Sequence, residues 1–218
     1  MQSRWYQTSL LYLLVLSLVF LIFLGNLEYR YAHEPYYHEL FEKHHVYSVL
    51  PEADTNNKKV MLYLTDPSTD LSVLDMTPFN EREKTHLMDV KVLIQRFIFV
   101  FELSLVIFVV GMVLLFLYAP RFYEQFTKLL LIGGASIVGI GFLLLLSSAV
   151  FALSFNAFHN VFFKPGTWLF LSSDYLISLY PFGFFRDFFI RIVLDSIFVG
   201  GVLALTGYIL KRFTTQRQ

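Results

Sequence analysis

The chain has 218 residues, of which 56% are hydrophobic, and a mean hydropathy of +0.58, too high for an ordinary soluble domain. Its 17 basic and 17 acidic residues cancel, so composition gives no reason to expect a nucleic-acid partner. Because there is no cysteine, disulfides, thiol catalysis and cysteine-bound metals are excluded. The composition predicts an integral membrane protein.

Four segments are apolar enough to cross a bilayer, which takes about 20 residues each. They are residues 1–25, 94–119, 126–153 and 188–210. A cleaved signal peptide is the alternative for the first, but the sequence after Leu24 lacks small residues at cleavage spacing, so we expect an uncleaved anchor. Small residues such as Gly134 and Gly200 predict close packing of the third and fourth spans. We therefore expect an all-α membrane protein with four transmembrane helices.

Lysine and arginine in the short connections predict the orientation in the membrane. They include Arg4 before the first span, Arg121 in the turn at 120–125, and Lys211 in the tail at 211–218. With four spans these regions share one side, so we expect both termini in the cytoplasm of a bacterial cell. The two long connections, residues 26–93 and 154–187, then face outward.

These outer segments are expected to form a small, mainly helical extracellular cap. Glu34 to Val49 and Asp54 to Thr65 have the pattern of amphipathic helices. Leu71 to Met76 alternates weakly, which favours a strand or an extended strip. The second helix should bury Val60, Met61, Leu62 and Leu64. A segment of this size cannot hold a core alone, so the two outer segments should share apolar contacts.

A polar stretch from Asn80 to Lys91 opens a helix that continues to Ala119 without a proline. Asn80 can cap this helix, and Glu83 can complete a capping box. His86 lies where the helix passes from water into lipid, and Asp89 shares its face. A histidine held there can exchange protons with a lipid substrate. Asp89 either orients the imidazole or is a surface charge.

The second outer segment surrounds another histidine with aromatic residues. Phe155, Phe158 and Phe162 recur at helical spacing beside His159. His159 should lie at the same depth as His86, on another helix. Interfacial aromatics often serve only as an anchoring belt, and two interfacial histidines can be purely structural. The two histidines are nevertheless the candidate acid–base pair.

Other polar residues give weaker signals. His33 and His38 are five residues apart, which does not fit a helical metal site, so neither they nor His44 and His45 are expected to bind metal. Charged residues in or near the spans should face the bundle interior, either as a polar floor or, as we favour, as an ion pair between spans two and four. They are Arg96, Glu102, Arg191 and Asp195.

Three motifs together resemble a known family. They are Glu83-Lys84-Thr85-His86-Leu87-Met88-Asp89-Val90-Lys91; Phe158-His159-Asn160-Val161-Phe162-Phe163 followed by Trp168; and Asp174-Tyr175-Leu176-Ile177 with Tyr180-Pro181. In these motifs, in length and in span count, the chain resembles the bacterial lipoprotein intramolecular transacylase (Lit) family of four-span membrane proteins.

The resemblance implies an acyltransferase of the bacterial plasma membrane. It would move the sn-2 acyl chain of a diacylglyceryl-modified lipoprotein to the α-amino group of the N-terminal cysteine, giving a lyso-form N-acyl S-monoacylglyceryl lipoprotein. His86 and His159 would be catalytic at the extracellular membrane interface, without cofactor or metal. We assign His86 as the base and His159 as the acid or oxyanion donor. We also expect a monomer in contact with membrane lipid. The substrate-orienting residues would be Asp89, Asn156, Phe158, Phe162, Trp168, Asp174, Tyr175 and Arg191.

The residues agree with that chemistry, because no serine or cysteine nucleophile has a recognisable motif. The substrate's own amine can be the nucleophile, attacking through an eight-membered ring that needs a pocket to close. Two other functions stay open. A lipase-like membrane hydrolase would use water and release free fatty acid, and a tetra-spanning scaffold or lipid-binding protein would leave lipids unchanged.

Overall fold

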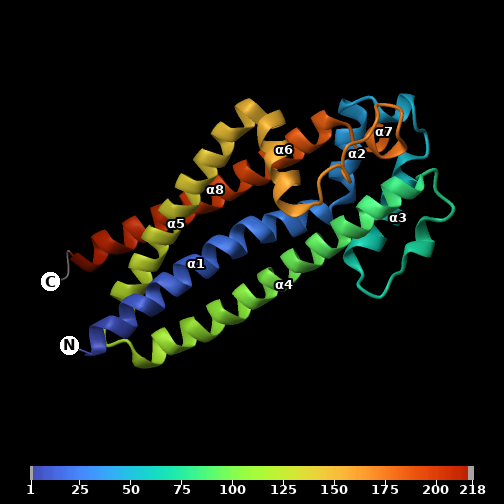
Figure 1. Cartoon of the computed structure of the whole chain (residues 1–218). Helices are drawn as coiled ribbons and strands as arrows, with labels where there is room; N and C mark the ends of the chain where they lie inside the picture. Colours follow the sequence, from blue (N-terminus) through green and yellow to red (C-terminus); the bar gives the residue numbers. More distant parts are fainter. Residues whose placement is uncertain (1, 216–218) are drawn as a thin grey trace. The chain divides into compact units, whose positions relative to one another are not determined.

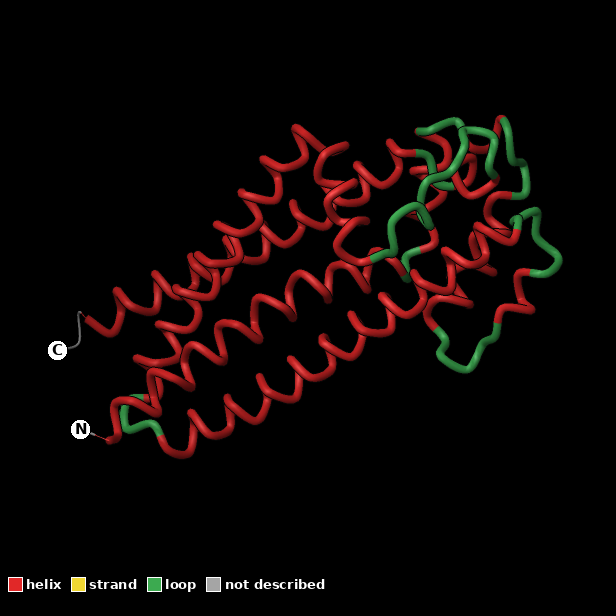
Figure 2. Tube along the Cα trace, in the orientation of Figure 1, coloured by secondary structure: helices red, strands yellow, loops and turns green. Residues whose placement is uncertain are grey.

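The computed structural model describes residues 2–215, and it contains helices and loops but no strand in that range (Figure 2). Four helical segments are long and apolar enough to cross a membrane, namely Tyr6–Tyr31, Glu81–Tyr118, Phe122–Phe162 and Phe182–Phe213. The prediction of an all-α protein with four membrane helices is therefore confirmed. The elements in chain order are α1 (Gln2–Tyr31), α2 (Glu34–Lys43), η1 (Val46–Ser48), α3 (Ala53–Thr65), η2 (Leu71–Leu74), α4 (Glu81–Tyr118), α5 (Phe122–Ser147), η3 (Ser148–Val150), α6 (Phe151–Phe162), α7 (Tyr175–Leu179) and α8 (Phe182–Thr215) (Figure 1).

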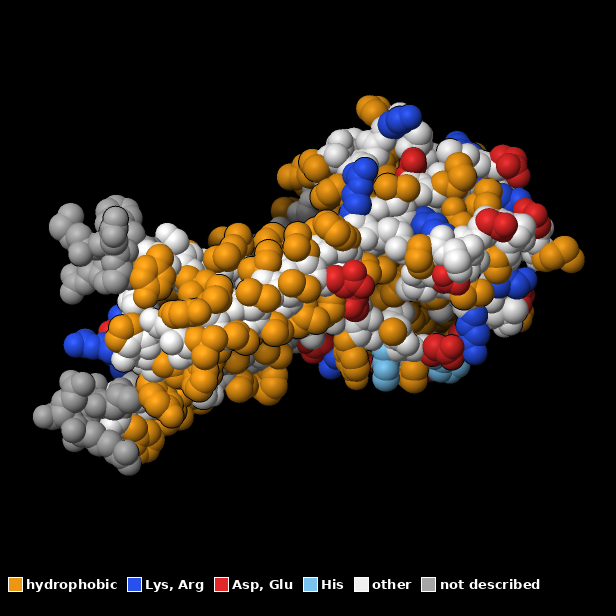
Figure 3. Space-filling view, turned by 90° about the horizontal axis from the view of Figure 1, so that it is seen from below, with side chains coloured by type: hydrophobic (Ala, Val, Ile, Leu, Met, Phe, Trp, Pro, Cys, Tyr) orange, Lys and Arg blue, Asp and Glu red, His pale blue; other side chains and the backbone are white. Residues whose placement is uncertain are grey.

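The chain divides into two compact units. Within the described residues, the bundle unit comprises residues 2–27, Phe99–Leu146 and residues 192–215. The loop unit comprises Glu28–Ile98 and Ser147–Arg191, and so contains the short helices and the long connections. On the face shown in Figure 3, hydrophobic side chains predominate over the long helices, whereas charged side chains are concentrated over the loop unit. Such an apolar surface suits lipid contact.

Small residues set the helix packing inside the bundle unit. A Cβ atom added to Gly134 of α5 would lie 2.5 Å from the backbone nitrogen of Ala204 and 2.5 Å from the carbonyl oxygen of Gly200, both on α8. Only a glycine lets these two backbones approach so closely. The predicted close packing of the third and fourth spans is therefore confirmed.

The loop unit has an apolar core of its own. Phe41 of α2, Leu74 of η2 and Leu179 of α7 are all completely buried in one cluster. Both outer segments contribute to this cluster, as expected for segments too short to fold alone. The loop unit is thus a packed structure that can hold side chains in fixed positions.

Two local predictions in the first outer segment are wrong. The helix from Glu34 ends at Lys43 rather than at Val49, because His45 adopts a left-handed conformation with φ of 56° that no helix continues. Leu71–Leu74 forms a short 3₁₀ helix and no strand. The carboxylate of Asp70 accepts a hydrogen bond from the backbone N–H of Ser72 at 2.9 Å and so caps this turn.

The buried face of α3 also differs from the prediction. Val60 and Leu64 are buried as expected, but Leu62 is 48% exposed. The face that packs inward follows helical spacing through Asn56, Asn57 and Tyr63, which places Leu62 on the opposite side. The run of apolar residues therefore did not predict the buried face of α3 correctly, since this face also includes two asparagines.

Arg96 and Glu102 do not face the interior as predicted, because both side chains are exposed on α4. Neither forms an ion pair within residues 2–215, so the predicted pair between the second and fourth spans is wrong for these two residues. The buried stripe of α4 runs through Ser104 and Leu115, and Glu102 lies on the opposite face. A long arginine can also extend toward water along its helix. Arg191 is exposed and Asp195 is half-buried.

Candidate active site

His86 of α4 and His159 of α6 lie against each other in the loop unit. Their ring centroids are 6.1 Å apart, and the ring planes differ by 24°, so the imidazoles are stacked. Only 6% of His86 is exposed, and His159 is half-buried. The structure thus brings together the two histidines that the sequence places on different helices.

The first turn of α4 positions His86. The side-chain oxygen of Asn80 accepts the backbone N–H of Glu83 at 3.0 Å, and the Glu83 carboxylate accepts the backbone N–H of Asn80 at 2.7 Å. This reciprocal pair is the predicted capping box, which is confirmed. His86 lies three residues after Glu83 and shares its buried face, since Glu83 is completely buried.

The preceding turn of α6 determines the tautomer of His159. Nδ1 of its ring lies 2.8 Å from the carbonyl oxygen of Phe155. Because a carbonyl can only accept, Nδ1 donates, and the neutral ring keeps an unprotonated Nε2. His159 therefore presents the nitrogen that can accept a proton.

Aromatic rings enclose the histidine pair. Phe163 and Phe170 lie 4.9 and 5.3 Å from the His86 ring, between centroids. Trp168 and Phe155 lie 4.8 and 4.0 Å from the His159 ring. Such walls limit the access of water and strengthen any polar contact made between them.

Two nitrogen atoms in this enclosure have no hydrogen-bond partner within the described residues. They are Nδ1 of His86 and Nε1 of Trp168, and both are buried. Unpartnered buried polar atoms are uncommon in proteins and cost about 1–3 kcal/mol each. They are therefore the atoms from which a bound polar group would gain most.

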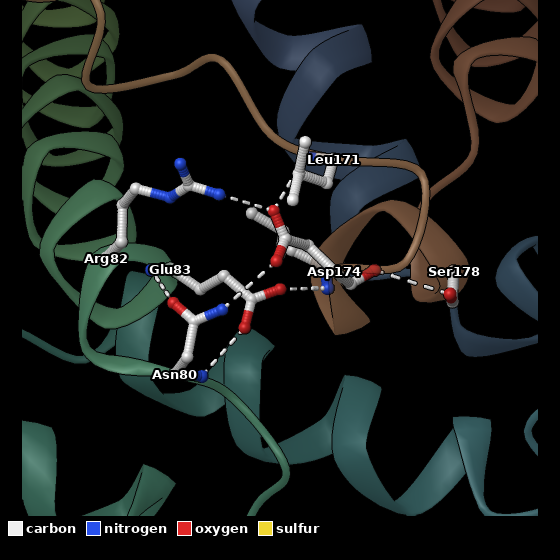
Figure 4. A network of polar contacts seen from close by, with 7 residues as sticks. Asn80, Arg82, Glu83, Leu171, Asp174 and Ser178 are labelled. Carbon is white, nitrogen blue, oxygen red and sulfur yellow. Dashed lines mark hydrogen bonds and ion pairs between the residues drawn. The ribbon is translucent and has the colours of Figure 1, made fainter.

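A buried carboxylate ties the enclosing loop to α4 (Figure 4). One oxygen of Glu83 accepts the backbone N–H of Leu176 at 2.6 Å, while the other accepts that of Asn80. The same side chain thus caps the helix that carries His86 and holds the start of α7. The capping motif signalled Glu83, but nothing local in the sequence signalled its second partner.

A second carboxylate strengthens this connection. Asp174 accepts hydrogen bonds from the guanidinium of Arg82 at 2.6 Å and from the backbone N–H of Leu171 at 2.7 Å (Figure 4). The guanidinium carbon of Arg82 also lies 5.3 Å from the centroid of the Phe170 ring. Asp174, expected to orient substrate, therefore holds the loop that carries Trp168 and Phe170.

The remaining predicted site residues are more dispersed. Asp89 is half-buried and forms no hydrogen bond to His86, so it does not orient that ring here. Tyr175 packs in the loop unit, where its hydroxyl accepts a hydrogen bond from Asn56 at 2.6 Å, and burial raises its pKa. Phe158 lies 5.6 Å from His159, between ring centroids. The exposed residues of the predicted set are Asn156, Phe158, Phe162 and Arg191.

Two of the other histidines make polar contacts with neighbouring side chains. Nε2 of His44 lies 2.8 Å from the carboxylate of Asp187, and Nδ1 of His38 lies 2.5 Å from the hydroxyl of Tyr47. Across residues 2–215, no group of three histidine, aspartate or glutamate side chains could hold a metal ion.

Comparison with known proteins relates this arrangement to a family. The sequence profile described as lipoprotein intramolecular transacylase Lit matches residues 9–185. An uncharacterized protein of Aquifex aeolicus (strain VF5) is 32% identical over 136 residues, which are 62% of this chain. The matched part spans only 59% of that relative.

Solved structures share the fold. The membrane integral lipoprotein intramolecular transacylase Lit of Bacillus cereus superposes with a TM-score of 0.75 at 21% identity over 97% of both chains. A variant of the same protein with a histidine replaced by arginine gives 0.76 at 22% identity, over 99% of this chain and 96% of that one. Because the family profile covers most of the sequence, the chain belongs to the lipoprotein intramolecular transacylase (Lit) family.

Proposed function

We propose that this chain transfers the sn-2 acyl group of a diacylglyceryl lipoprotein to the α-amino group of its N-terminal cysteine. The ester bond at sn-2 breaks, an amide bond forms, and the lyso-form N-acyl S-monoacylglyceryl lipoprotein is released. Family membership supports this reaction. The observation that carries it is the stacked pair of His86 and His159 inside an aromatic enclosure.

The enclosure addresses the two difficulties of the reaction. The attacking amine and the ester carbon close an eight-membered ring, so holding them in contact removes a large entropic barrier. The amine must also be neutral to attack, and free α-amino groups titrate near about 7.7–8.0. A base next to the amine therefore accelerates the transfer.

We assign His159 as that base, which reverses the assignment made from the sequence. Its Nδ1–H is held by the carbonyl of Phe155, so Nε2 is the atom that takes the proton from the amine. The same proton then passes to the leaving sn-2 oxygen, which balances the reaction. His86 donates its ring N–H toward the carbonyl oxygen as negative charge develops there. Burial disfavours a charge on His86, and two imidazolium charges at this separation would repel, so His86 stays neutral while His159 carries the proton.

The location and partners follow from the same proposal. A multi-pass protein of the bacterial plasma membrane would have both termini in the cytoplasm and the histidine pair at the outer face, as the basic residues of the turn and tail favour. Phe158 and Phe162 are 40% and 47% exposed on α6, beside His159, and would contact the acyl chains of the lipoprotein or of membrane lipid. The monomer would contain the whole site.

The test uses the full-length protein in membranes with a synthetic diacylglyceryl lipopeptide. We expect His86→Ala and His159→Ala each to slow formation of the N-acyl lyso product by at least about 10²-fold, the lower range of general acid–base catalysis. Mass spectrometry follows the product, and the thermal unfolding midpoint checks that each variant is folded.

The control is His38→Ala, whose ring is exposed and hydrogen-bonded to Tyr47, and which should retain full activity. Wild-type rates in either active-site variant would contradict the proposal. Free fatty acid as the product of the unaltered protein would instead identify a hydrolase.

A further inference from the structure

The indole N–H of Trp168 is a buried donor without an acceptor. Tryptophan Nε1 can only donate, and this one has no hydrogen-bond partner within the described residues. A tryptophan that serves only as packing usually directs its N–H to water or to a carbonyl when its ring is buried. Packing of the ring alone therefore does not explain why this N–H has no acceptor.

Its position next to a reactive imidazole supplies one. The Trp168 and His159 ring centroids are 4.8 Å apart, at an angle of 42° between planes. The loop that carries Trp168 is held on one side by Asp174, which accepts the N–H of Leu171 and pairs with Arg82. On the other side, the N–H of Thr167 donates to the carbonyl of Lys164 at 3.2 Å. The indole is thus fixed beside the proposed base.

The reaction proposed above requires hydrogen-bond donors at the ester carbonyl oxygen, and His86 supplies one of them. When the amine attacks the ester, the carbonyl oxygen becomes an oxyanion that must be stabilised, and one well-placed donor is worth about 10²–10³-fold in rate. The rings of Phe155, Phe163 and Phe170, which line the pair, offer no donor. Among the described residues, Nε1 of Trp168 and Nδ1 of His86 are the buried nitrogen atoms at these rings that have no hydrogen-bond partner.

We propose that Nε1–H of Trp168 donates a hydrogen bond to the carbonyl oxygen of the sn-2 ester, and that this bond strengthens as the oxyanion forms. Trp168 is then a catalytic residue that stabilises charge without giving up its proton. This role rests on the proposed transacylase reaction. The competing explanation is an N–H directed at the face of a neighbouring aromatic ring, a weak contact with no part in catalysis.

The first experiment removes the N–H and keeps the ring. Trp168 is replaced by 3-benzothienylalanine, in which sulfur stands in place of the N–H group, and separately by phenylalanine (Trp168→Phe). We expect the single-turnover rate of acyl transfer to fall about 10²-fold in the benzothienyl variant, with the apparent affinity for lipopeptide changed less than about threefold. Trp5→Phe is the matched control and should retain the wild-type rate.

A second measurement separates hydrogen bonding from a purely structural effect. Each protein is assayed with an sn-2 ester and with the corresponding thionoester, whose sulfur is a poor hydrogen-bond acceptor. Comparing the oxygen-to-sulfur rate ratio between proteins cancels the intrinsic reactivity of the two substrates. If Trp168 donates to this atom, the ratio should be lower in the benzothienyl variant than in the wild type by about the factor lost in rate.

Each outcome decides the question. A wild-type rate in the benzothienyl variant overturns the inference, and so does a slow variant that keeps the wild-type oxygen-to-sulfur ratio. A failure of the transacylase reaction itself is recognised separately, because the unaltered protein would then yield free fatty acid or no product.

Discussion

At the scale of single residues, the hydrogen bond from His159 to the carbonyl of Phe155 has the largest chemical consequence. It fixes which ring nitrogen carries hydrogen, and so which nitrogen can act as a base. Both histidines could be chosen from their sequence motifs, but this tautomer depends on helical geometry one turn earlier. Asp89 shows the opposite case, since its spacing from His86 suggested a hydrogen bond that the side chains do not form.

Asp66 offers a test of local electrostatics outside the membrane helices. The hydroxyls of Ser68 and Thr69 and the N–H of Ser68 donate to its carboxylate and lower its pKa to about 2. A carboxylate with a folded pKa below its unfolded value of about 3.9 stabilises the fold above that value, and this contribution is lost as the pH falls toward 2.

We therefore expect Asp66→Ala to unfold at a lower temperature than the wild type at pH 6, with the difference shrinking as the pH falls from about 4 to about 2. Thermal unfolding of the purified protein across this range measures the effect. Asp75→Ala, which removes the exposed partner of Lys84, is the comparison. A difference that stays constant with pH would exclude this role for Asp66.

At the scale of elements, hydrogen bonds connect the first turn of α4 to the loop leading to α7, and together these two segments position the histidine pair. Glu83 accepts from both Asn80 and Leu176, and Asp174 accepts from both Arg82 and Leu171 (Figure 4). The capping half of this arrangement follows from local sequence spacing. The half that reaches α7 depends on where the loop folds back, which spacing along the chain does not encode.

Glu83→Gln is expected to weaken the connection between α4 and the loop, although the two side chains have nearly the same shape. The amide keeps one acceptor oxygen, so either Asn80 or Leu176 loses its backbone hydrogen bond and faces an NH₂ group instead. A buried donor left without an acceptor costs about 1–3 kcal/mol. Faster amide hydrogen exchange at Leu176 or at Asn80, together with slower acyl transfer, should follow.

Glu81→Gln provides the control, because Glu81 lies in the same first turn of α4 but its carboxylate is exposed. This substitution should change neither the exchange rate nor the rate of acyl transfer. If the Glu83→Gln variant had the wild-type rates of amide hydrogen exchange and acyl transfer, the buried carboxylate would have no part in holding the loop.

At the scale of the whole molecule, the absence of cysteine makes the proposed membrane orientation directly testable with single-cysteine variants. Met76 in the loop unit is 87% exposed, and Tyr123 at the start of α5 is 76% exposed. With the termini in the cytoplasm, Met76→Cys should react with a membrane-impermeant maleimide in intact cells. Tyr123→Cys should react only after the membrane is opened.

The reverse labelling pattern would place the histidine pair on the cytoplasmic side. That result would remove the proposed access to lipoproteins at the outer face, while leaving the acyl-transfer chemistry of His86 and His159 untouched. Reaction of both cysteines in intact cells would indicate leaky cells, which an impermeant dye detects.

The sequence by itself determined the features that depend on neighbours along the chain. Hydropathy over about 20 residues identified four membrane helices, because crossing a bilayer is a requirement of length and composition. The Asn80 and Glu83 pair identified the start of α4, because a capping box is completed within one turn. The two histidine motifs identified the family.

Only the tertiary structure decided how those pieces combine. That Phe170 closes over His86, that Glu83 holds Leu176, and that the indole N–H of Trp168 lacks a partner are all consequences of loops returning from distant parts of the chain. Such contacts are selected by the packing of the loop unit as a whole. Spacing along the chain identified Glu83 as a capping residue and Trp168 as part of a motif, but it did not predict which distant group each of them would meet.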